Sequence, residues 1–177
     1  MRRLVSGLGC IVGMLLLLGC NRVGEPTPAS LPTPVVLSQW AATAEASSSF
    51  GFPDWSATRA TGAPEVNACV DDPRAWASAR GDGLAWLELG YARPVYATEV
   101  RIYQTLGRGA VARVLLIDDA GVAQLVWEGT DNGICPGVLA VSFSRTVFRV
   151  HRVRVELDES RTGFWNQIDA VELIGLP

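Results

Sequence analysis

From Val35 to the end of the chain, short segments with alternating apolar and polar residues follow one another, separated by turn residues. Alternation with a period of two is typical of strands that bury one face, and no segment keeps a helical period over three turns. The clearest strand segments span 95–105, 111–118, 122–129 and 151–157. The turn between the second and third of these predicts an antiparallel hairpin. An all-β domain is therefore expected.

The alternation also predicts which side chains share a face. In the first segment one face carries Tyr96, Thr98, Val100 and Ile102. In the last segment the core face carries Val153, Val155 and Leu157, and His151 has the same parity. A lone histidine in such a strand is more often packed than catalytic.

Further strands are predicted near 37–44, 85–89, 139–143 and 167–174. About eight short strands with Gly, Pro and Asp turns favour a two-sheet jelly-roll β-sandwich. The segment 50–80 is rich in Ser, Ala and Pro, and we expect a structured loop with short helical turns. The 177 residues are enough for one domain.

The chain opens with Arg2, Arg3 and an apolar run that ends at Gly19. This run is shorter than the roughly 20 residues of a membrane-spanning helix, so it predicts a signal peptide over 1–19. The run ends in "LLGC", which resembles the bacterial lipobox, where the cysteine is lipidated and becomes the new N-terminus. We expect Cys20 to be lipidated; the alternative is an ordinary secreted protein cut near this residue.

Four prolines between Cys20 and residue 36 favour an extended tether over 20–36, followed by a folded domain over 37–177. The expected location is outside the cytoplasm, with the lipid holding the chain to the outer face of the cytoplasmic membrane or to an outer membrane if one exists. The net charge of −3, without a basic run, argues against nucleic acid or anionic headgroups as partners.

Two cysteines, Cys69 and Cys135, remain after the signal peptide and the lipidated residue are set aside. In an exported protein such a pair predicts a disulfide rather than a metal site, because no CxxC spacing or nearby histidine accompanies either residue. The bond would stabilise the fold by roughly 4 kcal/mol in the chain-entropy account. The alternative is a pair of free thiols.

Five stretches carry a family resemblance, and they cover nearly all of the domain. In order they are "WAATAEASSSF…WSATRATGAPEV", "AWASARGDGLAWLELGYARPVYATEVRIYQT", "GAVARVLLIDDAG", "VWEGTDNGICPG" and "GFWNQIDAVELIG". Together they resemble a bacterial branch of the galactose-binding-like superfamily, which is related to discoidin and coagulation-factor C-type domains and has similar modules in pappalysin-type proteins.

The resemblance implies a β-sandwich whose loops at one end often bind sugars, frequently with a structural calcium ion. It also implies a cysteine before "AWAS" paired with one in a "CP" turn, and Cys69 and Cys135 match these places. It does not imply an activity, since such domains serve as sugar-binding, protein-binding or spacer modules.

The last predicted strand contains two carboxylates, Asp169 and Glu172, which fall on opposite faces. Glu172 shares its face with apolar residues and is expected to be buried, whereas Asp169 is free to face solvent. In the resembling family a glutamate near this place helps to hold calcium, and Asp71 and Asp72 are candidate loop ligands. A salt bridge between Glu172 and an arginine is the alternative.

Two tryptophans, Trp55 and Trp165, lie in loop-like contexts, whereas Trp40, Trp76, Trp86 and Trp127 fit strand patterns and are expected in the core. Exposed tryptophan stacks on sugar rings, and arginine or asparagine supplies hydrogen bonds to hydroxyl groups. The predicted ligand-binding rim comprises Trp55, Arg108, Arg161, Trp165 and Asn166. The alternative is that the "WN" pair is a structural plug.

Enzyme motifs are missing from the sequence: it has one histidine, no GxSxG and no HExxH. The adjacent pairs Asp71–Asp72 and Asp118–Asp119 fit turn capping better than a catalytic dyad. We therefore expect a non-catalytic binding module that needs no cofactor beyond a structural calcium ion, with envelope or environmental carbohydrate as its ligand. A structural or protein-interaction lipoprotein is the alternative, and a hydrolase is third.

Overall fold

The computed structural model describes residues 35–177, so the predicted signal peptide, Cys20 and all but the last two residues of the predicted tether lie outside the described residues. Nine strands form the domain: β1 (Leu37–Trp40), β2 (Thr43–Ala46), β3 (Trp76–Ala77), β4 (Leu84–Leu106), β5 (Val111–Asp118), β6 (Ala123–Glu128), β7 (Gly137–Ser142), β8 (Val150–Asp158) and β9 (Gln167–Leu176). Two 3₁₀ turns accompany them: η1 (Ala57–Ala60) and η2 (Glu159–Arg161).

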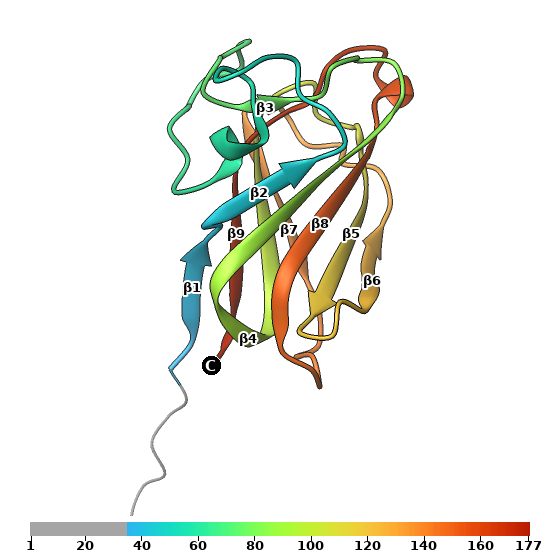
Figure 1. Cartoon of the computed structure of the whole chain (residues 1–177). Coiled ribbons are helices and arrows are strands. Elements are labelled where there is room, and N and C mark those ends of the chain that lie inside the picture. Colours follow the sequence, from blue (N-terminus) through green and yellow to red (C-terminus); the bar gives the residue numbers. More distant parts are fainter. Residues whose placement is uncertain (1–34) are drawn as a thin grey trace, which may run out of the picture. The chain divides into compact units, whose positions relative to one another are not determined.

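The strands make two antiparallel layers, which confirms the predicted all-β sandwich (Figure 1). In one layer, here called the β9 sheet, β1 and β3 pair with one edge of β9 and β4 pairs with its other edge. β7 also pairs with β4 in this layer. In the other, the β8 sheet, the order is β2, β4, β8, β5, β6. The predicted hairpin of β5 with β6 is confirmed.

One strand, β4, belongs to both layers. Residues up to Gly90 pair with β8, and the register shifts before Val95, after which the strand pairs with β9. The sequence "GYARPV" between these pairings contains Pro94, which cannot donate a backbone hydrogen bond to a ladder. The sequence predicted separate strands over 85–89 and 95–105; the structure joins them into one strand of 23 residues that bends between the layers.

The core between the layers is aliphatic. The predicted inward set of Val153, Val155 and Leu157 is confirmed, and all three are almost fully buried. In β4 the register shifts again between Ala97 and Glu99. This bulge changes the parity, so Ala97 is buried and Tyr96 is 37% exposed, contrary to the prediction that Tyr96 shares the inward face.

Two other predictions of core position are wrong. His151 is exposed, 3.9 Å from Asp119, because Val150 takes the inward place and the pairing of β5 with β8 shifts register there. Of the four predicted core tryptophans, Trp76 is fully buried and the partly buried Trp127 packs against the core, whereas Trp40 and Trp86 do not belong to it. Trp86 lies under the guanidinium of Arg154, 4.5 Å from the ring centroid, on the outer side of the β8 sheet.

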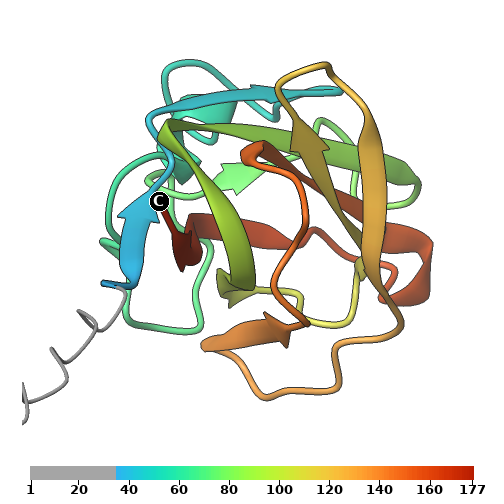
Figure 2. The same ribbon diagram turned by 90° about the horizontal axis from the view of Figure 1, so that it is seen from below.

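The two ends of the sandwich differ. The first described residues and the C-terminus lie together at one end, where Leu37 pairs with Gly175 (Figures 1 and 2). The long loop between β2 and β4 covers the other end, and it contains η1 and β3 as the predicted loop with short turns. Within residues 35–177 no helix has the length and apolar character needed to cross a membrane.

Candidate functional site

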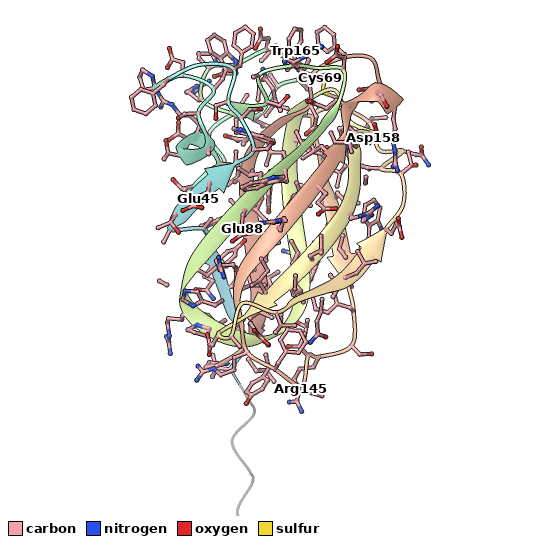
Figure 3. All side chains as sticks on the ribbon, turned by 45° about the vertical axis from the view of Figure 1, so that its right-hand side comes forward. Glu45, Cys69, Glu88, Arg145, Asp158 and Trp165 are labelled. Atoms are coloured by element: carbon pink, nitrogen blue, oxygen red, sulfur yellow. A yellow bond between two sulfur atoms is a disulfide. The ribbon has the colours of Figure 1, made fainter. Side chains whose placement is uncertain are left out.

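Four aromatic side chains gather at the loop end, where Figure 3 shows Trp165. The ring of Phe50 lies 5.4 Å from that of Trp55 and 5.7 Å from that of Trp165, and the ring of Phe164 also lies 5.7 Å from that of Trp165. All three contacts are edge to face, a favoured geometry for aromatic pairs. Together these rings form the apolar wall of a shallow hollow, here called the aromatic pocket.

Hydrogen bonds fix both tryptophans of the aromatic pocket. The indole N–H of Trp165 donates to the Ser78 carbonyl at 3.1 Å, and that of Trp55 donates to Asp71 Oδ1 at 2.9 Å. Trp55 also has a φ of 51°, a left-handed conformation that is unfavourable for a bulky side chain. Such strain is typical of sites where the surrounding structure holds a residue for function.

The polar wall of the aromatic pocket consists of Asp71 and Gln167. Gln167 Nε2 donates to Asp71 Oδ1 at 2.6 Å, and its Oε1 accepts the Asp72 amide hydrogen at 3.0 Å. The pocket has a volume of about 110 Å³, and Ala77 and Leu106 complete its lining. It therefore presents rigid rings beside a fixed carboxylate and amide.

Two glycines allow the Trp165 segment to sit tightly against its neighbours. A Cβ on Gly81 would come within 2.7 Å of the Trp165 amide nitrogen. A Cβ on Gly107, which has a φ of 58°, would overlap the Trp165 carbonyl oxygen. Both glycines are therefore part of the site's framework, and nothing local in the sequence marks them, because the close approach joins segments far apart in the chain.

The predicted disulfide is confirmed, and it joins the segment just before Asp71 to the loop before β7. Cys69 and Cys135 are bonded, with Cα atoms 5.2 Å apart (Figure 3). The next residue, Val70, donates its amide hydrogen to the Thr105 carbonyl at 3.0 Å. The bond therefore fixes the segment that carries Asp71 against β4 and the loop before β7.

Arg108 and Asn166 do not belong to a binding rim, contrary to the prediction. Arg108 forms a bidentate pair with Asp131 at 2.7 and 2.8 Å, and the side chains are only 8% and 5% exposed. Gln104 Nε2 donates to the same carboxylate at 2.7 Å, and its Oε1 accepts from Asn166 Nδ2 at 2.8 Å. Asn166 is fully buried. These residues form a buried polar network beneath the loops.

Charge pairing controls the pKa of Asp131 in this network. Burial alone would raise it, but the hydrogen bonds from Arg108 and its neighbours outweigh burial and hold the pKa below its usual range. The carboxylate therefore stays ionised beside the guanidinium.

A second buried carboxyl, Glu159, is hydrogen-bonded to the backbone of the residue that follows Trp165. Its Oε2 is 2.5 Å from Ser78 Oγ, and its Oε1 accepts the Asn166 amide hydrogen at 3.0 Å. Burial raises the pKa of Glu159, although these hydrogen bonds oppose the shift. Ser78 Oγ also lies 2.7 Å from the Arg80 carbonyl, so a protonated Glu159 can donate to Ser78 while Ser78 donates onward.

Arg161, the remaining residue of the predicted rim, lies apart from the aromatic pocket. It donates to the Gly129 carbonyl at 2.6 Å and to Asp158 at 3.3 Å, and it lines a separate hollow beside Trp86. Of the five predicted rim residues, only Trp55 and Trp165 meet at one site. The sequence could not show this, because the pocket draws its walls from three distant segments.

The predicted calcium ligands are also separated. Glu172 is hydrogen-bonded to Ser38, to Tyr103 at 3.3 Å and to Arg101 at 3.4 Å, which matches the salt-bridge alternative. Asp72 pairs with Arg74 at 2.7 Å, and Asp71 belongs to the aromatic pocket. Among residues 35–177 no three His, Cys, Asp or Glu side chains group as metal ligands. These three carboxylates therefore do not form one site.

Asp169 is 1% exposed and Glu172 is 7% exposed, so the expectation that Asp169 faces solvent is wrong. The loop between β2 and β4 covers its side of β9, where Asp169 Oδ2 accepts the amide hydrogens of Glu65 and Val66, each at 2.9 Å. Burial raises the pKa of Asp169. Its role is to hold this loop on the sheet.

Comparisons with known proteins agree with the architecture. The sequence model of the family described as "Pappalysin-1, SD scarf domain, C-terminal" matches residues 33–177. No curated protein matches the chain in sequence.

Among solved structures, chitosan-binding module 1 of a chitosanase/glucanase from Paenibacillus sp. IK-5 is 21% identical, with a TM-score of 0.56 over 74% of this chain and 92% of that one. The family 32 carbohydrate-binding module of C. perfringens NanJ, in complex with galactose, is 17% identical, with a TM-score of 0.58 over 78% and 99%. The same module type from AlyQ, in complex with 4,5-unsaturated mannuronic acid, is 18% identical, with a TM-score of 0.58 over 77% and 97%. These similarities show a shared fold.

Proposed function

Because the chain belongs to the family of the pappalysin-1 SD scarf domain, C-terminal, and has the fold of carbohydrate-binding modules, we propose that it is a non-catalytic carbohydrate-binding protein. The observation that carries this proposal is the aromatic pocket. Its rings can stack on the apolar face of a sugar, and Asp71, which Trp55 and Gln167 hold in place, can accept hydrogen bonds from hydroxyl groups.

The rings of the pocket are both fixed and exposed, which supports ligand binding rather than packing alone. Phe50 and Phe164 are about half exposed, at 54% and 49%, although they contact the better-buried tryptophans. Rigid aromatic rings lose little conformational entropy when a ligand stacks on them. An apolar wall that is both exposed and fixed is therefore suited to a ligand with a flat apolar face.

The expected lipid anchor at Cys20 is part of the proposal. The first described residues lie at the end of the sandwich opposite Trp165 (Figures 1 and 3). A chain held to a membrane through its N-terminal segment would have its attachment point at the end away from the aromatic pocket. This arrangement suits a ligand from the cell envelope or the environment.

A protein partner is the second candidate, favoured by Phe52. This side chain is 87% exposed in the same loop as Phe50, which enlarges the apolar surface beyond the pocket. Exposed aromatic residues are also enriched in protein interfaces. On this alternative the loop end docks an envelope protein and binds no sugar.

A glycan array with the soluble chain of residues 21–177 tests the proposal. We expect saturable binding that is lost in Trp165→Ala and kept in Trp86→Ala, which removes a tryptophan from the outer side of the β8 sheet. An absence of binding to every arrayed glycan would favour the protein partner. A parallel array with chelator tests the predicted structural calcium ion, since a calcium-dependent protein would lose binding there.

A further inference from the structure

The aromatic pocket has one charged group, and that group is negative. Its lining comprises the four aromatic residues, Ala77, Leu106, Gln167 and Asp71, so no arginine lines it. Electrostatics at this site therefore depend on Asp71.

Asp71 differs from the other aspartates of the surrounding loops in having no cationic partner. Asp54 pairs with Arg59 at 3.0 Å, Asp72 with Arg74 at 2.7 Å and Asp82 with Arg80 at 3.0 Å. Within residues 35–177, no salt bridge involves Asp71. Its negative charge is therefore not neutralised by a neighbouring side chain.

The carboxylate of Asp71 is also oriented. Its Oδ1 accepts from two neutral donors, Trp55 Nε1 at 2.9 Å and Gln167 Nε2 at 2.6 Å. No hydrogen bond within the described domain occupies Oδ2, and Asp71 is exposed. One oxygen is thus fixed by the pocket, and the other is available to a ligand.

We propose that the aromatic pocket selects sugars with a free, protonated amino group over their N-acetylated and acidic counterparts, with Asp71 as the specificity-determining residue. An ammonium group beside Asp71 Oδ2 forms a charge-assisted hydrogen bond, which is stronger than a bond to a neutral group. The faces of the surrounding aromatic rings also attract a cation. An acetamide lacks the charge, and a uronic acid is repelled by it. This inference rests on the proposed sugar-binding function.

Calorimetric titration of residues 21–177 with three oligosaccharides tests the selectivity. The ligands are a glucosamine oligomer, the N-acetylglucosamine oligomer of the same length and a uronic acid oligomer, all at a pH where the amine is protonated. We expect about threefold tighter binding of the glucosamine oligomer than of its acetylated form, consistent with one additional charged contact at an exposed site. The uronic acid oligomer should bind most weakly.

Asp71→Asn is the decisive variant, because it keeps an acceptor for Trp55 and Gln167 and removes the charge. We expect the preference for the free amine to disappear while the acetylated oligomer binds as before. Asp82→Asn removes the same charge from a carboxylate outside the pocket lining and should keep the threefold preference. A thermal melt of each variant verifies the fold.

Three results would overturn the inference, each in a different way. Equal or tighter binding of the acetylated or acidic oligomer, with loss in Trp165→Ala, would refute the selectivity and leave the sugar-binding function standing. Failure of all three oligomers and of the glycan array would refute both. An unchanged preference in Asp71→Asn would refute the role of this residue.

Discussion

Arginine has different surroundings at the loop end and on the outer side of the β8 sheet. At the loop end Arg108 and Asp131 are only 8% and 5% exposed. On the sheet Arg113 lies 3.1 Å from Glu128 and 3.2 Å from Glu156, but its side chain is 51% exposed and that of Glu128 is 59% exposed. Both regions contain arginine–carboxylate pairs at similar distances, and burial distinguishes them.

This difference determines what each pair contributes. Water screens the exposed pairs, so each is worth well under 1 kcal/mol. Removing one partner of a buried pair leaves an uncompensated charge, which costs about 3–5 kcal/mol. We infer that the loop end owes its rigidity to buried polar groups, whereas the sheet face uses its charges mainly for solubility. Four predictions test this contrast.

The largest effect is expected from the disulfide. The double variant Cys69→Ser, Cys135→Ser opens a loop with a sequence separation of 66 residues and should lower the free energy of unfolding by about 4 kcal/mol. Urea denaturation measures this change, and the wild-type protein under reducing conditions is its control, since it should match the variant. A loss below about 1 kcal/mol would mean that the loop end is held without the bond.

The second largest effect compares the stability contributed by a buried arginine–carboxylate pair with that of an exposed pair. Arg108→Ala should lower the free energy of unfolding by about 3 kcal/mol, because it leaves Asp131 buried without its cation. Arg113→Ala is the matched control, with an expected change of about 0.5 kcal/mol or less. Equal effects in the same urea titrations would remove the distinction between the two regions.

An intermediate effect is expected at Glu88, which lies midway along the sandwich (Figure 3). Its carboxylate is 8% exposed but accepts from two more exposed arginines, Arg152 at 2.6 Å and Arg154 at 2.8 Å. Glu88→Gln should lower the free energy of unfolding by about 1.5 kcal/mol, the scale of one charged hydrogen bond. A cost as large as that of Arg108→Ala would show that the sheet face also depends on buried charge.

The smallest effect is expected in the pH dependence of the free energy of unfolding, through Glu159. Because its folded pKa is raised above the usual 4.5, the unfolded chain releases this proton first as pH rises. The free energy of unfolding therefore falls with rising pH through that range, and Asp169 contributes in the same direction. Glu159→Gln mimics the protonated form and should flatten the fall that begins near pH 4.5, as measured by thermal melts at several pH values.

The direction of that change is decisive. Asp131 has the opposite effect, because its folded pKa is lowered. It stabilises the fold above its unfolded pKa, and this stability is lost as the pH falls, in a lower pH range than that of Glu159. Glu128→Gln, at the exposed pair with Arg113, is the matched control and should leave the profile over the same pH range nearly unchanged. An identical slope in wild type and Glu159→Gln would contradict the proposed role of Glu159.

The sequence predicts the fold well, because strands that bury one face show their alternation locally. Val153, Val155 and Leu157 are such a case. It fails where the backbone breaks the alternation, as at the bulge that exposes Tyr96, or where a distant loop covers a strand, as over Asp169. Neither event has a local signal.

The candidate site is predicted only in part for the same reason. The loop contexts of Trp55 and Trp165 are visible in the sequence, and the two residues do meet. The partners that complete the pocket, Phe50 and Gln167, depend on how the loops fold back. Arg108 looks like a free loop arginine until the structure brings Asp131 to it.

The bend of β4 has a consequence for folding. Since the halves of this strand belong to different layers, neither layer can separate from the other without breaking the ladder of β4 with β8 or with β9. The pairings also join residues far apart in the chain, which slows folding. We therefore expect the domain to unfold in one cooperative transition, with amide hydrogens in both halves of β4 exchanging only through global opening.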